Sequence, residues 1–328
     1  MRAMGAERTG QALRLLDLPE PQAGEGEIRL KVRACGVCHT DLHVVDGDLP
    51  QHQTPIVPGH QVVGFVDQVA SGASGFKEGD RAGVPWLFRS DGVCRYCQSG
   101  QENLCDAPLF TGYDVPGGYA EYVVAPAAFV HHLPSNYDDV GVAPLLCAGI
   151  VGFRAVRVCG IQPGETVALI GFGASAHVVL QVLRHWACTV LVGTRGSAHQ
   201  QLARELGAAW AGGSDQLPAG EADRAIVFAP VGSVALDALQ AVRKGGTVAI
   251  GSVYSSPIPE MDYDRYLFNE RVLRSVTAAT RDDARTFLRL AEHTPIKTDV
   301  EAVPLEQAND ALDKLRHSQI RGAAVLTT

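Results

Sequence analysis

The sequence predicts an α/β protein with two parts, an irregular β-rich domain and a doubly wound parallel sheet with intervening helices. Three observations carry this prediction. Short β-like runs separated by Gly, Pro and Asp turns fill the chain up to about residue 147. From residue 164 onward, regular strands alternate with helix-length segments. A glycine-rich turn follows the first of those strands.

Length and composition fit two domains and a small-molecule partner. The chain has 328 residues, of which 46% are hydrophobic, so it can bury a large core. Its formal net charge is −8, and Lys and Arg form no block. Nucleic acids and anionic membrane surfaces both need a positive footprint. The sequence therefore argues against nucleic-acid and membrane partners.

The chain is expected to be cytoplasmic. Its first residues, MRAMGAERTG, lack the apolar core of a signal peptide. The apolar segment 166–183 is interrupted by GFGASAH, which is typical of a strand, a turn and a helix rather than a membrane span. In a reducing compartment the eight cysteines are better metal ligands than disulfide partners.

The strands of the first part are short, whereas those of the second part repeat regularly. In the first part we expect strands at 27–37, 61–69 and 118–126. In the second part strands are predicted at 166–171, 188–193, 224–229, 246–251 and 272–278, with helices at 174–186 and 197–208. A helix at 281–293 and a strand, helix and strand within 300–326 complete the chain, and the last strand could return to the first domain.

The glycine-rich turn predicts a dinucleotide site. GFGASA gives Gly171, Gly173 and Ala176 the spacing G-x-G-x-x-G/A. The first glycine permits a tight turn, the second lets the backbone approach a pyrophosphate, and the small third residue lets the helix pack on the strand. The helix amino terminus then faces the phosphates. The motif lies between a strand and a helix, which favours a ligand over a bare turn.

The residues that follow the strand predicted at 188–193 distinguish NAD from NADP. An Asp or Glu there would accept the ribose hydroxyls of NAD, but this chain has Thr194 followed by Arg195. A hydroxyl and a guanidinium suit a ribose 2′-phosphate. We therefore expect NADP(H). The alternative is that Arg195 is a solvated charge beside a turn.

Cysteine and histidine residues form a second pattern. Cys38 lies in CGVCHTDLH, His60 in PGHQVVG and Cys147 in APLLCAGI. With these motifs in this order, followed by the glycine turn, the sequence resembles the zinc-dependent medium-chain alcohol dehydrogenases over essentially its whole length. The resemblance implies that these three residues are the ligands of a catalytic zinc. Two sulfurs and one imidazole leave a fourth position for substrate.

The same resemblance implies the domain organisation. It assigns residues 1–148 and 281–328 to a β-rich GroES-like catalytic domain, and 149–280 to a doubly wound Rossmann cofactor domain. The active site is expected in the cleft between them. Cys35, Cys159 and Cys188 match no ligand position and are expected to be core thiols.

The neighbours of Cys38 acquire roles by resemblance. Thr40 is expected to supply a hydroxyl beside the metal, and His43 to accept the proton at the surface end of a relay that includes the cofactor ribose. Asp41 matches the carboxylate that fixes the imidazole of His60. His39 is placed to meet the cofactor pyrophosphate. For His39 and His43 a plain surface role is the alternative.

Two positions depart from the family pattern. Gln61 follows the ligand histidine where relatives usually carry Glu, so no carboxylate at this position can join the metal. Ala323 stands where many relatives place an arginine that contacts the cofactor, and Arg321 lies two residues away.

A second metal lobe is expected in SDGVCRYCQSGQENLC. The family spaces its structural zinc ligands by two, two and seven residues. On Cys94, Cys97 and Cys105 this spacing selects Asp91 as the first ligand. A carboxylate is an acceptable zinc ligand, although it is harder and shorter-reaching than a thiolate. A four-coordinate site stabilises the fold rather than taking part in chemistry.

The sequence thus predicts an NADP(H)-dependent alcohol dehydrogenase that acts as an aldehyde reductase and assembles as a homodimer or homotetramer. The alternatives are a zinc-free quinone or enoyl reductase of the same superfamily, and a non-catalytic zinc- or nucleotide-binding protein. Apolar residues near the motifs are candidates for the substrate pocket wall, or else ordinary core: Val45, Leu49, Trp86 and Phe110.

Overall fold

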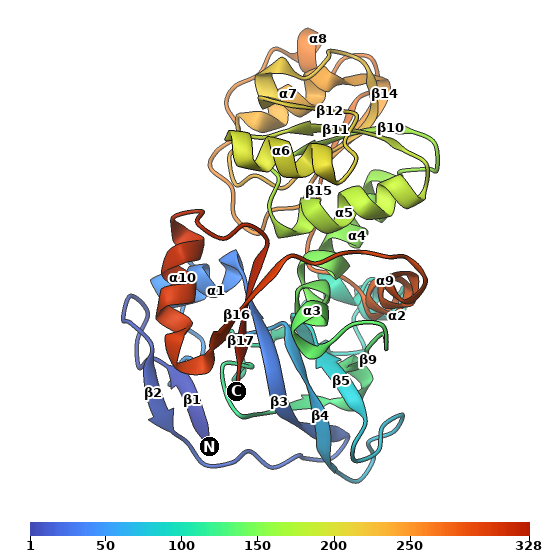
Figure 1. Cartoon of the computed structure of the whole chain (residues 1–328). Helices are drawn as coiled ribbons and strands as arrows, with labels where there is room; N and C mark the ends of the chain where they lie inside the picture. Colours follow the sequence, from blue (N-terminus) through green and yellow to red (C-terminus); the bar gives the residue numbers. More distant parts are fainter. The chain divides into compact units, whose positions relative to one another are not determined.

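The computed structural model describes residues 1–328, which form two compact units (Figure 1). The first unit contains Met1–Cys147, Ala279–His293 and Thr298–Thr328. The second contains Ala148–Ala278 and Thr294–Lys297. Both ends of the chain therefore belong to the first unit.

The first unit is built on a seven-stranded sheet. Its order is β16-β17-β3-β4-β5-β9, and β8 pairs with β3 off this path. β3 alternates buried and exposed positions along its first half and becomes wholly buried at its end, where the chain enters the metal-ligand segment. β17 pairs antiparallel with β3. The strands of this sheet are β3 (Glu27–Val37), β4 (Val62–Val69), β5 (Arg81–Val84), β8 (Tyr122–Pro126), β9 (His131–His132), β16 (Val300–Pro304) and β17 (Ala323–Thr327).

Short elements surround this sheet. Two strand pairs, β1 with β2 and β6 with β7, are antiparallel ribbons. The remaining elements of the unit are β1 (Arg2–Gly5), β2 (Arg14–Asp17), α1 (His39–Asp46), β6 (Leu87–Arg89), α2 (Arg95–Gln98), η1 (Glu102–Leu104), β7 (Leu109–Phe110), η2 (Ala127–Phe129), α3 (Asp139–Val142), η3 (Ala143–Leu146), α9 (Arg281–His293), η5 (Leu305–Gln307) and α10 (Ala308–Arg316).

The second unit is a six-stranded sheet in the order β12-β11-β10-β13-β14-β15, and every neighbouring pair is parallel. This arrangement confirms the predicted doubly wound fold class. Its elements are α4 (Ala148–Cys159), β10 (Thr166–Ile170), α5 (Ala174–His185), β11 (Thr189–Gly193), α6 (Ser197–Glu205), β12 (Trp210–Gly212), η4 (Ser214–Gln216), β13 (Ala222–Val227), α7 (Val234–Ala241), β14 (Val242–Ile250), α8 (Tyr263–Tyr266) and β15 (Val272–Ser275).

Both faces of the parallel sheet are buried. On β10, Val167 and Leu169 join one apolar cluster, and Ala168 and Ile170 join the cluster on the other face. α5 covers the first face and α7 the second. This double burial explains why the strands are continuous hydrophobic runs rather than alternating ones. Each of the larger side chains, those of Val167, Leu169 and Ile170, contributes about 1.5 to 3 kcal/mol when fully buried.

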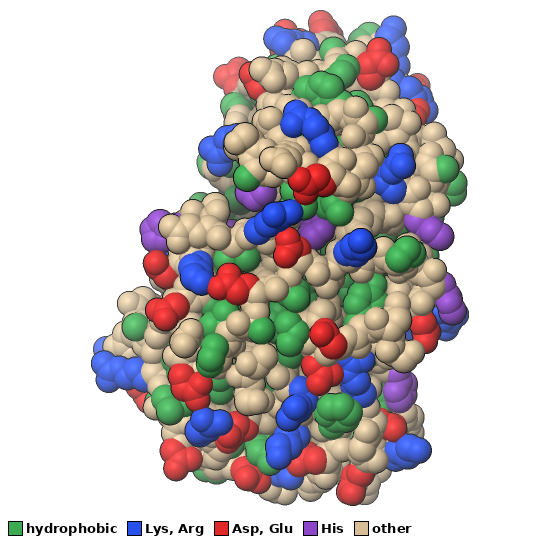
Figure 2. Space-filling model, in the orientation of Figure 1, with side chains coloured by type: hydrophobic (Ala, Val, Ile, Leu, Met, Phe, Trp, Pro, Cys, Tyr) green, Lys and Arg blue, Asp and Glu red, His purple; other side chains and the backbone are tan.

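One helical stretch, Asp139–Cys159, is 21 residues long and has a mean hydropathy of 1.7, so by length and composition alone it could cross a membrane. However, 72% of its apolar window is buried within the protein, and core helices of globular proteins pass the same test. The segment 166–183, by contrast, is a strand, a turn and the start of a helix, as predicted. On the face drawn in Figure 2, acidic and basic side chains are interspersed, and no basic patch stands out.

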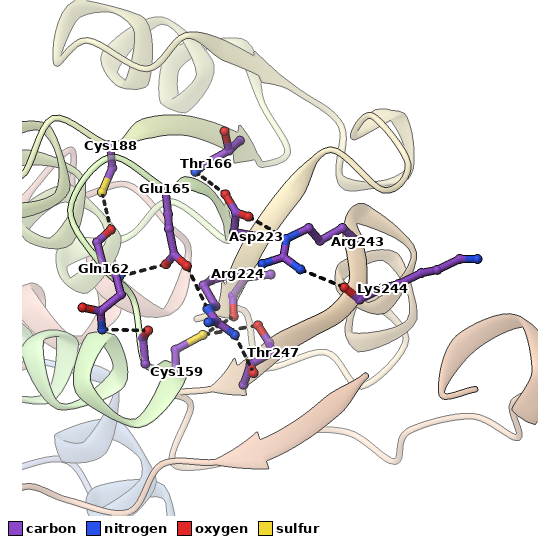
Figure 3. Close-up of polar contacts among 12 residues, drawn as sticks. Cys159, Gln162, Glu165, Thr166, Cys188, Asp223, Arg224, Arg243, Lys244 and Thr247 are labelled. Carbon is purple, nitrogen blue, oxygen red and sulfur yellow. Dashed lines mark hydrogen bonds and ion pairs between the residues drawn. The ribbon is translucent and has the colours of Figure 1, made fainter. Parts of the chain in front are cut away.

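A polar network joins β13 to neighbouring elements of the second unit (Figure 3). Asp223 accepts hydrogen bonds from the backbone N–H of Thr166 at 2.9 Å and from Nε of Arg243 at 2.6 Å. Arg224 donates to the hydroxyl of Thr247 at 3.1 Å and lies 3.4 Å from a carboxylate oxygen of Glu165. These contacts tie β10, β13 and β14 together beside the register shift between Ala222 and Arg224.

Asp223→Asn should lower the stability of the second unit by about 1 to 2 kcal/mol at pH 7, because the charged acceptor of two hydrogen bonds is lost. Burial raises the pKa of Asp223, but the hydrogen bonds from Arg243 and from the Thr166 backbone outweigh it, so the pKa lies below its usual value. This contribution is present above the unfolded-state pKa of about 3.9 and is lost as pH falls through the folded-state pKa.

The measurement is thermal unfolding of the wild type and the variant between pH 7 and about pH 2. The difference in melting temperature should stay nearly constant down to about pH 4 and narrow below it, because the folded-state pKa of Asp223 lies below its usual value. Glu221→Gln is the matched control, because Glu221 carries the same charge on an exposed side chain two residues away. An equal loss of stability in both variants would contradict the role of the hydrogen bonds.

Candidate active site

The end of β3 runs directly into the first candidate metal ligand. Cys38 is the N-cap of α1, and its sulfur accepts the backbone N–H of Thr40 at 3.3 Å. The carboxylate of Asp41 reaches back to the Cys38 N–H at 2.9 Å, which completes a capping box. A sulfur at a helix amino terminus faces N–H groups and the positive end of the helix dipole. This position favours a thiolate.

His60 is positioned by the same carboxylate. Its Nδ1 lies 3.1 Å from Oδ1 of Asp41, and Oδ1 also accepts the Gly59 N–H at 3.0 Å. Both ionisable side chains are 1% exposed. Gly59 has φ +102°, a left-handed conformation that favours glycine. The predicted contact between Asp41 and His60 is therefore present, and it turns Nε2 of His60 toward Cys38.

Cys147 completes a cluster of three donor atoms. The sulfurs of Cys38 and Cys147 and a ring nitrogen of His60 all lie within 4.8 Å of one another. The distance from Cys38 Sγ to His60 Nε2 is 3.1 Å. Zinc bond lengths and a tetrahedral angle would set a sulfur and a nitrogen about 3.6 Å apart. The donor set thus suits zinc after a shift of a few tenths of an ångström.

The electrostatics of the cluster also suit a cation. A hydrogen bond from Cys147 holds the pKa of the Cys38 thiol well below its usual value, against the effect of burial and with help from His60. Burial lowers the pKa of His60, but the charges of Cys38 and Asp41 raise it by more, so it lies well above its usual value. Negative charge therefore collects on the sulfur of Cys38, whereas the hydrogen bond to Cys38 and burial raise the pKa of the Cys147 thiol. A metal ion would neutralise the Cys38 thiolate.

The predicted relay residues lie on α1. Thr40 is buried, with 6% of its surface exposed, whereas His39 is exposed. Nδ1 of His43 is 2.7 Å from a carboxylate oxygen of Asp48. No sequence motif marks Asp48. Its position five residues after His43, beyond the end of the helix, is what brings the two together.

An aromatic group lies against His60. Trp86 meets the His60 ring edge-on, with centroids 4.9 Å apart, and stacks on Phe110 at 4.8 Å. The structure thus brings together two of the four predicted wall residues beside the metal donors. Val45 instead belongs to the main core cluster of the first unit. Leu49 is half-buried.

The second predicted ligand set also converges. Ligand atoms of Asp91, Cys94, Cys97 and Cys105 lie within 4.8 Å of one another. Oδ1 of Asp91 accepts the N–H groups of Val93 and Cys94, at 2.8 and 2.9 Å. These backbone hydrogen bonds, from Cys94 first, keep the pKa of Asp91 well below its usual value. An ionised carboxylate with one oxygen free of backbone bonds can serve as the fourth ligand.

In the second unit, the glycine turn has the predicted geometry. Gly171 has φ +85°, and a side chain there would stand 2.7 Å from the backbone nitrogen of Ala229. Ala176 lies in the first turn of α5 and is completely buried. Gly173 is the N-cap of α5, and a Cβ added to it would meet no protein atom within 4 Å. The protein itself therefore does not require glycine at 173, whereas close approach of a pyrophosphate would.

The end of β11 carries no acid. Thr194 is buried, with 7% of its surface exposed, and its carbonyl oxygen accepts a hydrogen bond from Gln200 at 3.0 Å. Arg195 is exposed and is engaged in none of the ion pairs of the protein. Its guanidinium is therefore available to a ligand.

The structure shows the surroundings of Gln61 and Arg321, the residues at or near the two departures from the family pattern. Gln61 is 2% exposed, and its side chain lies over Gly36, where an added Cβ would be 2.7 Å from the Gln61 amide oxygen. Arg321 precedes β17 and lies 3.1 Å from a carboxylate oxygen of Asp299. It is already paired, which weakens the idea that it replaces an arginine at position 323.

A Cys-His-Cys donor set around a buried histidine in a β-rich domain, and a glycine turn at the head of a parallel sheet, are the parts of a dinucleotide-dependent dehydrogenase. Comparisons with known proteins give the same answer. Residues 24–135 match the model of the alcohol dehydrogenase GroES-like domain. The chain is 47% identical to a probable alcohol dehydrogenase, AdhA, of Mycobacterium tuberculosis, over 93% of this chain and 90% of that protein.

Other similarities extend over nearly the whole chain. An alcohol dehydrogenase of Geobacillus stearothermophilus is 37% identical, over 99% of this chain and 98% of that protein. The solved structure of a cinnamyl alcohol dehydrogenase of Sorghum bicolor superimposes with a TM-score of 0.93 at 25% identity, covering 99% and 97% of the two chains. The chain belongs to the zinc-dependent medium-chain alcohol dehydrogenase family. It is thus an alcohol dehydrogenase, whose reactants are a small alcohol and the corresponding aldehyde or ketone.

Gly173→Ala should weaken dinucleotide binding about 10- to 100-fold, because overpacking a close contact typically costs 1 to 3 kcal/mol. The folded protein should be as stable as the wild type or slightly more stable, since the added Cβ meets no protein atom and the backbone, at φ −96°, suits alanine. Equilibrium binding of NADPH and thermal unfolding measure the two effects separately.

Gly171→Ala is the matched control. It should lower stability, because φ is +85° and the added Cβ would collide with Ala229. If Gly173→Ala bound the dinucleotide normally, the ligand would not approach α5 at this residue.

Proposed function

We propose that this alcohol dehydrogenase is zinc-dependent, uses NADP(H) and acts as an aldehyde reductase. The observation that carries the proposal is the convergence of Cys38, His60 and Cys147, whose ligand atoms lie within 4.8 Å of one another. A solved relative from Pyrobaculum aerophilum contains cobalt and zinc, with a TM-score of 0.90 at 26% identity. Its contents support the choice of metal for this chain.

Zinc at this site would supply a Lewis acid that stabilises the alkoxide form of the substrate. The side chains around it have separate tasks. The hydroxyl of Thr40 takes or returns the substrate proton in a buried position. His43 exchanges that proton with solvent, and Asp48 orients its ring through the 2.7 Å contact to Nδ1.

Trp86 and Phe110 give the substrate site an apolar wall. Their rings are nearly parallel, at 14°, and the pair stands beside His60. Flat aromatic surfaces favour substrates with an apolar or aromatic substituent next to the carbonyl. This proposal defines a class of aldehydes rather than one compound.

NADP(H) is proposed on the residues at the end of β11. Both cofactors occur among similar structures: an acetophenone reductase of Geotrichum candidum is in complex with NAD, and a putative zinc-binding dehydrogenase of Sinorhizobium meliloti is bound to NADP. The choice for this chain therefore rests on its own Thr194 and Arg195. Because cellular NADPH is usually kept reduced, the proposed direction is from aldehyde to alcohol.

We also propose a structural zinc held by Asp91, Cys94, Cys97 and Cys105, a cytoplasmic location and a homo-oligomer. All eight cysteines are free, which suits a reducing compartment. β15 is an edge strand with mostly exposed residues, and Val272 and Phe268 nearby are exposed apolar side chains. Even a short edge strand of this kind leaves backbone groups unpaired, and these can pair with a second copy.

The alternatives make different predictions about metal. A zinc-free quinone or enoyl reductase would share the glycine turn but would have no use for three converging donors. A non-catalytic binding protein would leave the pairing of His43 and Asp48 unexplained. Metal analysis combined with NADPH oxidation on a panel of aldehydes separates the three.

Purified protein should contain two zinc ions per chain. Cys147→Ala should retain one zinc, lose nearly all turnover and still bind NADPH, because the donors of the second lobe are untouched. Asp91→Ala should also retain one zinc but keep turnover and unfold at a lower temperature. Asp91→Cys should keep both ions. Aldehyde reduction that survives in zinc-free Cys147→Ala would overturn the zinc mechanism, and a single zinc in the wild type would remove the second site.

The catalytic efficiency should favour NADPH over NADH. A charge-assisted hydrogen bond to phosphate is worth about 1.5 to 3 kcal/mol, which corresponds to roughly ten- to a hundredfold in affinity. Arg195→Ala should therefore weaken the binding of NADPH by that factor and leave the binding of NADH unchanged. Thr194→Asp combined with Arg195→Ala should invert the preference, because a carboxylate accepts ribose hydroxyls and repels the phosphate. Equal efficiency with NADH in the wild type would refute the assignment.

A further inference from the structure

Tyr119 is a buried polar group that the proposed mechanism does not use. Its side chain is completely buried, and its hydroxyl has no partner with normal hydrogen-bond geometry, although a weak hydrogen-bond contribution from Asp41 is among the causes that raise its pKa. Buried tyrosine hydroxyls in folded proteins nearly always have a partner. The ring is held firmly, because a Cβ on Gly59 would stand only 2.5 Å from it and the Tyr119 N–H donates to Pro58 at 3.0 Å.

Asp41, which orients His60, lacks one hydrogen-bond donor, just as the Tyr119 hydroxyl lacks an acceptor. A carboxylate offers about four acceptor positions, two on each oxygen. Oδ1 is filled by the Gly59 N–H and by Nδ1 of His60, whereas Oδ2 receives only the Cys38 N–H. One acceptor position on a fully buried carboxylate thus remains unused.

The position of the ring favours Asp41 as the acceptor of the hydroxyl, because the ring packs on Gly59, whose N–H donates to Oδ1 of Asp41 at 3.0 Å. Burial raises the pKa of Tyr119 well above its usual value, and the negative charge of Asp41 is the next largest cause. Cys35 and Cys38 contribute less. Cys35 is a poor alternative, because burial keeps its thiol neutral, its S–H is directed to the Gly36 carbonyl, and a neutral sulfur accepts hydrogen bonds weakly.

We propose that Tyr119 is a positioning residue for the metal site, whose hydroxyl donates to Oδ2 of Asp41 and thereby fixes the carboxylate that orients His60. The chain of contacts runs from the phenol O–H to Asp41, and from Asp41 Oδ1 to the Nδ1–H of His60. It leaves the Nε2 lone pair of His60 directed at the metal. With all four acceptor positions filled, the carboxylate cannot rotate, so the imidazole keeps one tautomer and one orientation.

This inference rests on the proposed zinc site, and Tyr119→Phe tests it because only the hydroxyl is removed while the ring still packs on Gly59. Zinc affinity is measured by competition with a chromogenic chelator. Removing a direct partner of a metal-bound histidine typically costs 10- to 100-fold in affinity, and Tyr119 is one hydrogen bond further away, so a loss of about three- to tenfold is expected. The cobalt-substituted variant should also show a shifted visible spectrum, which a purely structural role would leave unchanged.

Two further variants locate the effect. In the Asp41→Asn background, Tyr119→Phe should cause no additional loss, because the amide NH2 cannot accept the hydroxyl. Tyr122→Phe is the matched control, since this tyrosine lies in β8 under the guanidinium of Arg29 and is remote from the metal donors in its contacts. It should bind zinc like the wild type.

Each contrary result has one meaning. If Tyr119→Phe bound zinc normally and unfolded at the same or a higher temperature, the hydroxyl would be an unpaired group and the inference would be wrong. An equal loss in the Asp41→Asn background, or in Tyr122→Phe, would also overturn it. If the wild type itself held no zinc at Cys38, His60 and Cys147, the proposed function would fail instead, which is a distinguishable outcome.

Discussion

Three polar hydrogens converge on the buried carboxylate of Asp41: the N–H groups of Cys38 and Gly59, and the Nδ1–H of the His60 ring. These contacts join the end of β3 to the loop before β4, which are 18 or more residues apart in sequence. A charged side chain in such a position is costly unless it is fully hydrogen-bonded. The geometry of both metal donors therefore depends on how completely this carboxylate is satisfied.

The backbone around this carboxylate is correspondingly crowded. The N–H groups of Gly117, Gly118 and Tyr119 donate to the carbonyls of residues 57 to 59 at 2.8 to 3.0 Å. A Cβ on Gly117 would lie 2.2 Å from the Gly59 carbonyl oxygen. Only glycine permits two backbones to approach so closely. The segment before β8 thus clamps the loop that carries His60. Gly117 is required by this contact with the loop, whereas a Cβ on Gly118 would stand 2.4 Å from the side chain of Val62 in β4.

The sequence predicted the features that depend on local pattern. The parallel strands were recognisable because both of their faces are buried, and Gly171 because the turn after β10 needs a positive φ. The contact between Asp41 and His60 was predicted through the family resemblance alone. Strands of two or three residues, such as β7 and β12, carry too little pattern to be identified.

Other features depend on distant segments meeting, and no local pattern encodes them. The edge of Trp86 against His60, the pairing of His43 with Asp48, and the hydroxyl of Tyr119 near Asp41 all belong to this class. In the sequence Tyr119 is simply one aromatic residue of a β-like run. The signal that could have identified it is the adjacent Gly117-Gly118 pair, which marks close backbone contact, but its partner is visible only in three dimensions.

The two donor clusters of the first unit differ in burial, and this difference separates their capabilities. Both clusters contain two partly exposed sulfurs and one buried donor, but the carboxylate of the second cluster, Asp91, is exposed, whereas His60 and the carboxylate behind it, Asp41, are each 1% exposed. Electrostatic interactions are strong where water is excluded and weak where it is not. A cation in the exposed cluster can hold a loop together, but water screens its charge. A cation held by Cys38, His60 and Cys147 would lie beside the buried pair of His60 and Asp41, where water is largely excluded. Its charge would be screened less there, so this cluster is the one suited to stabilise an alkoxide.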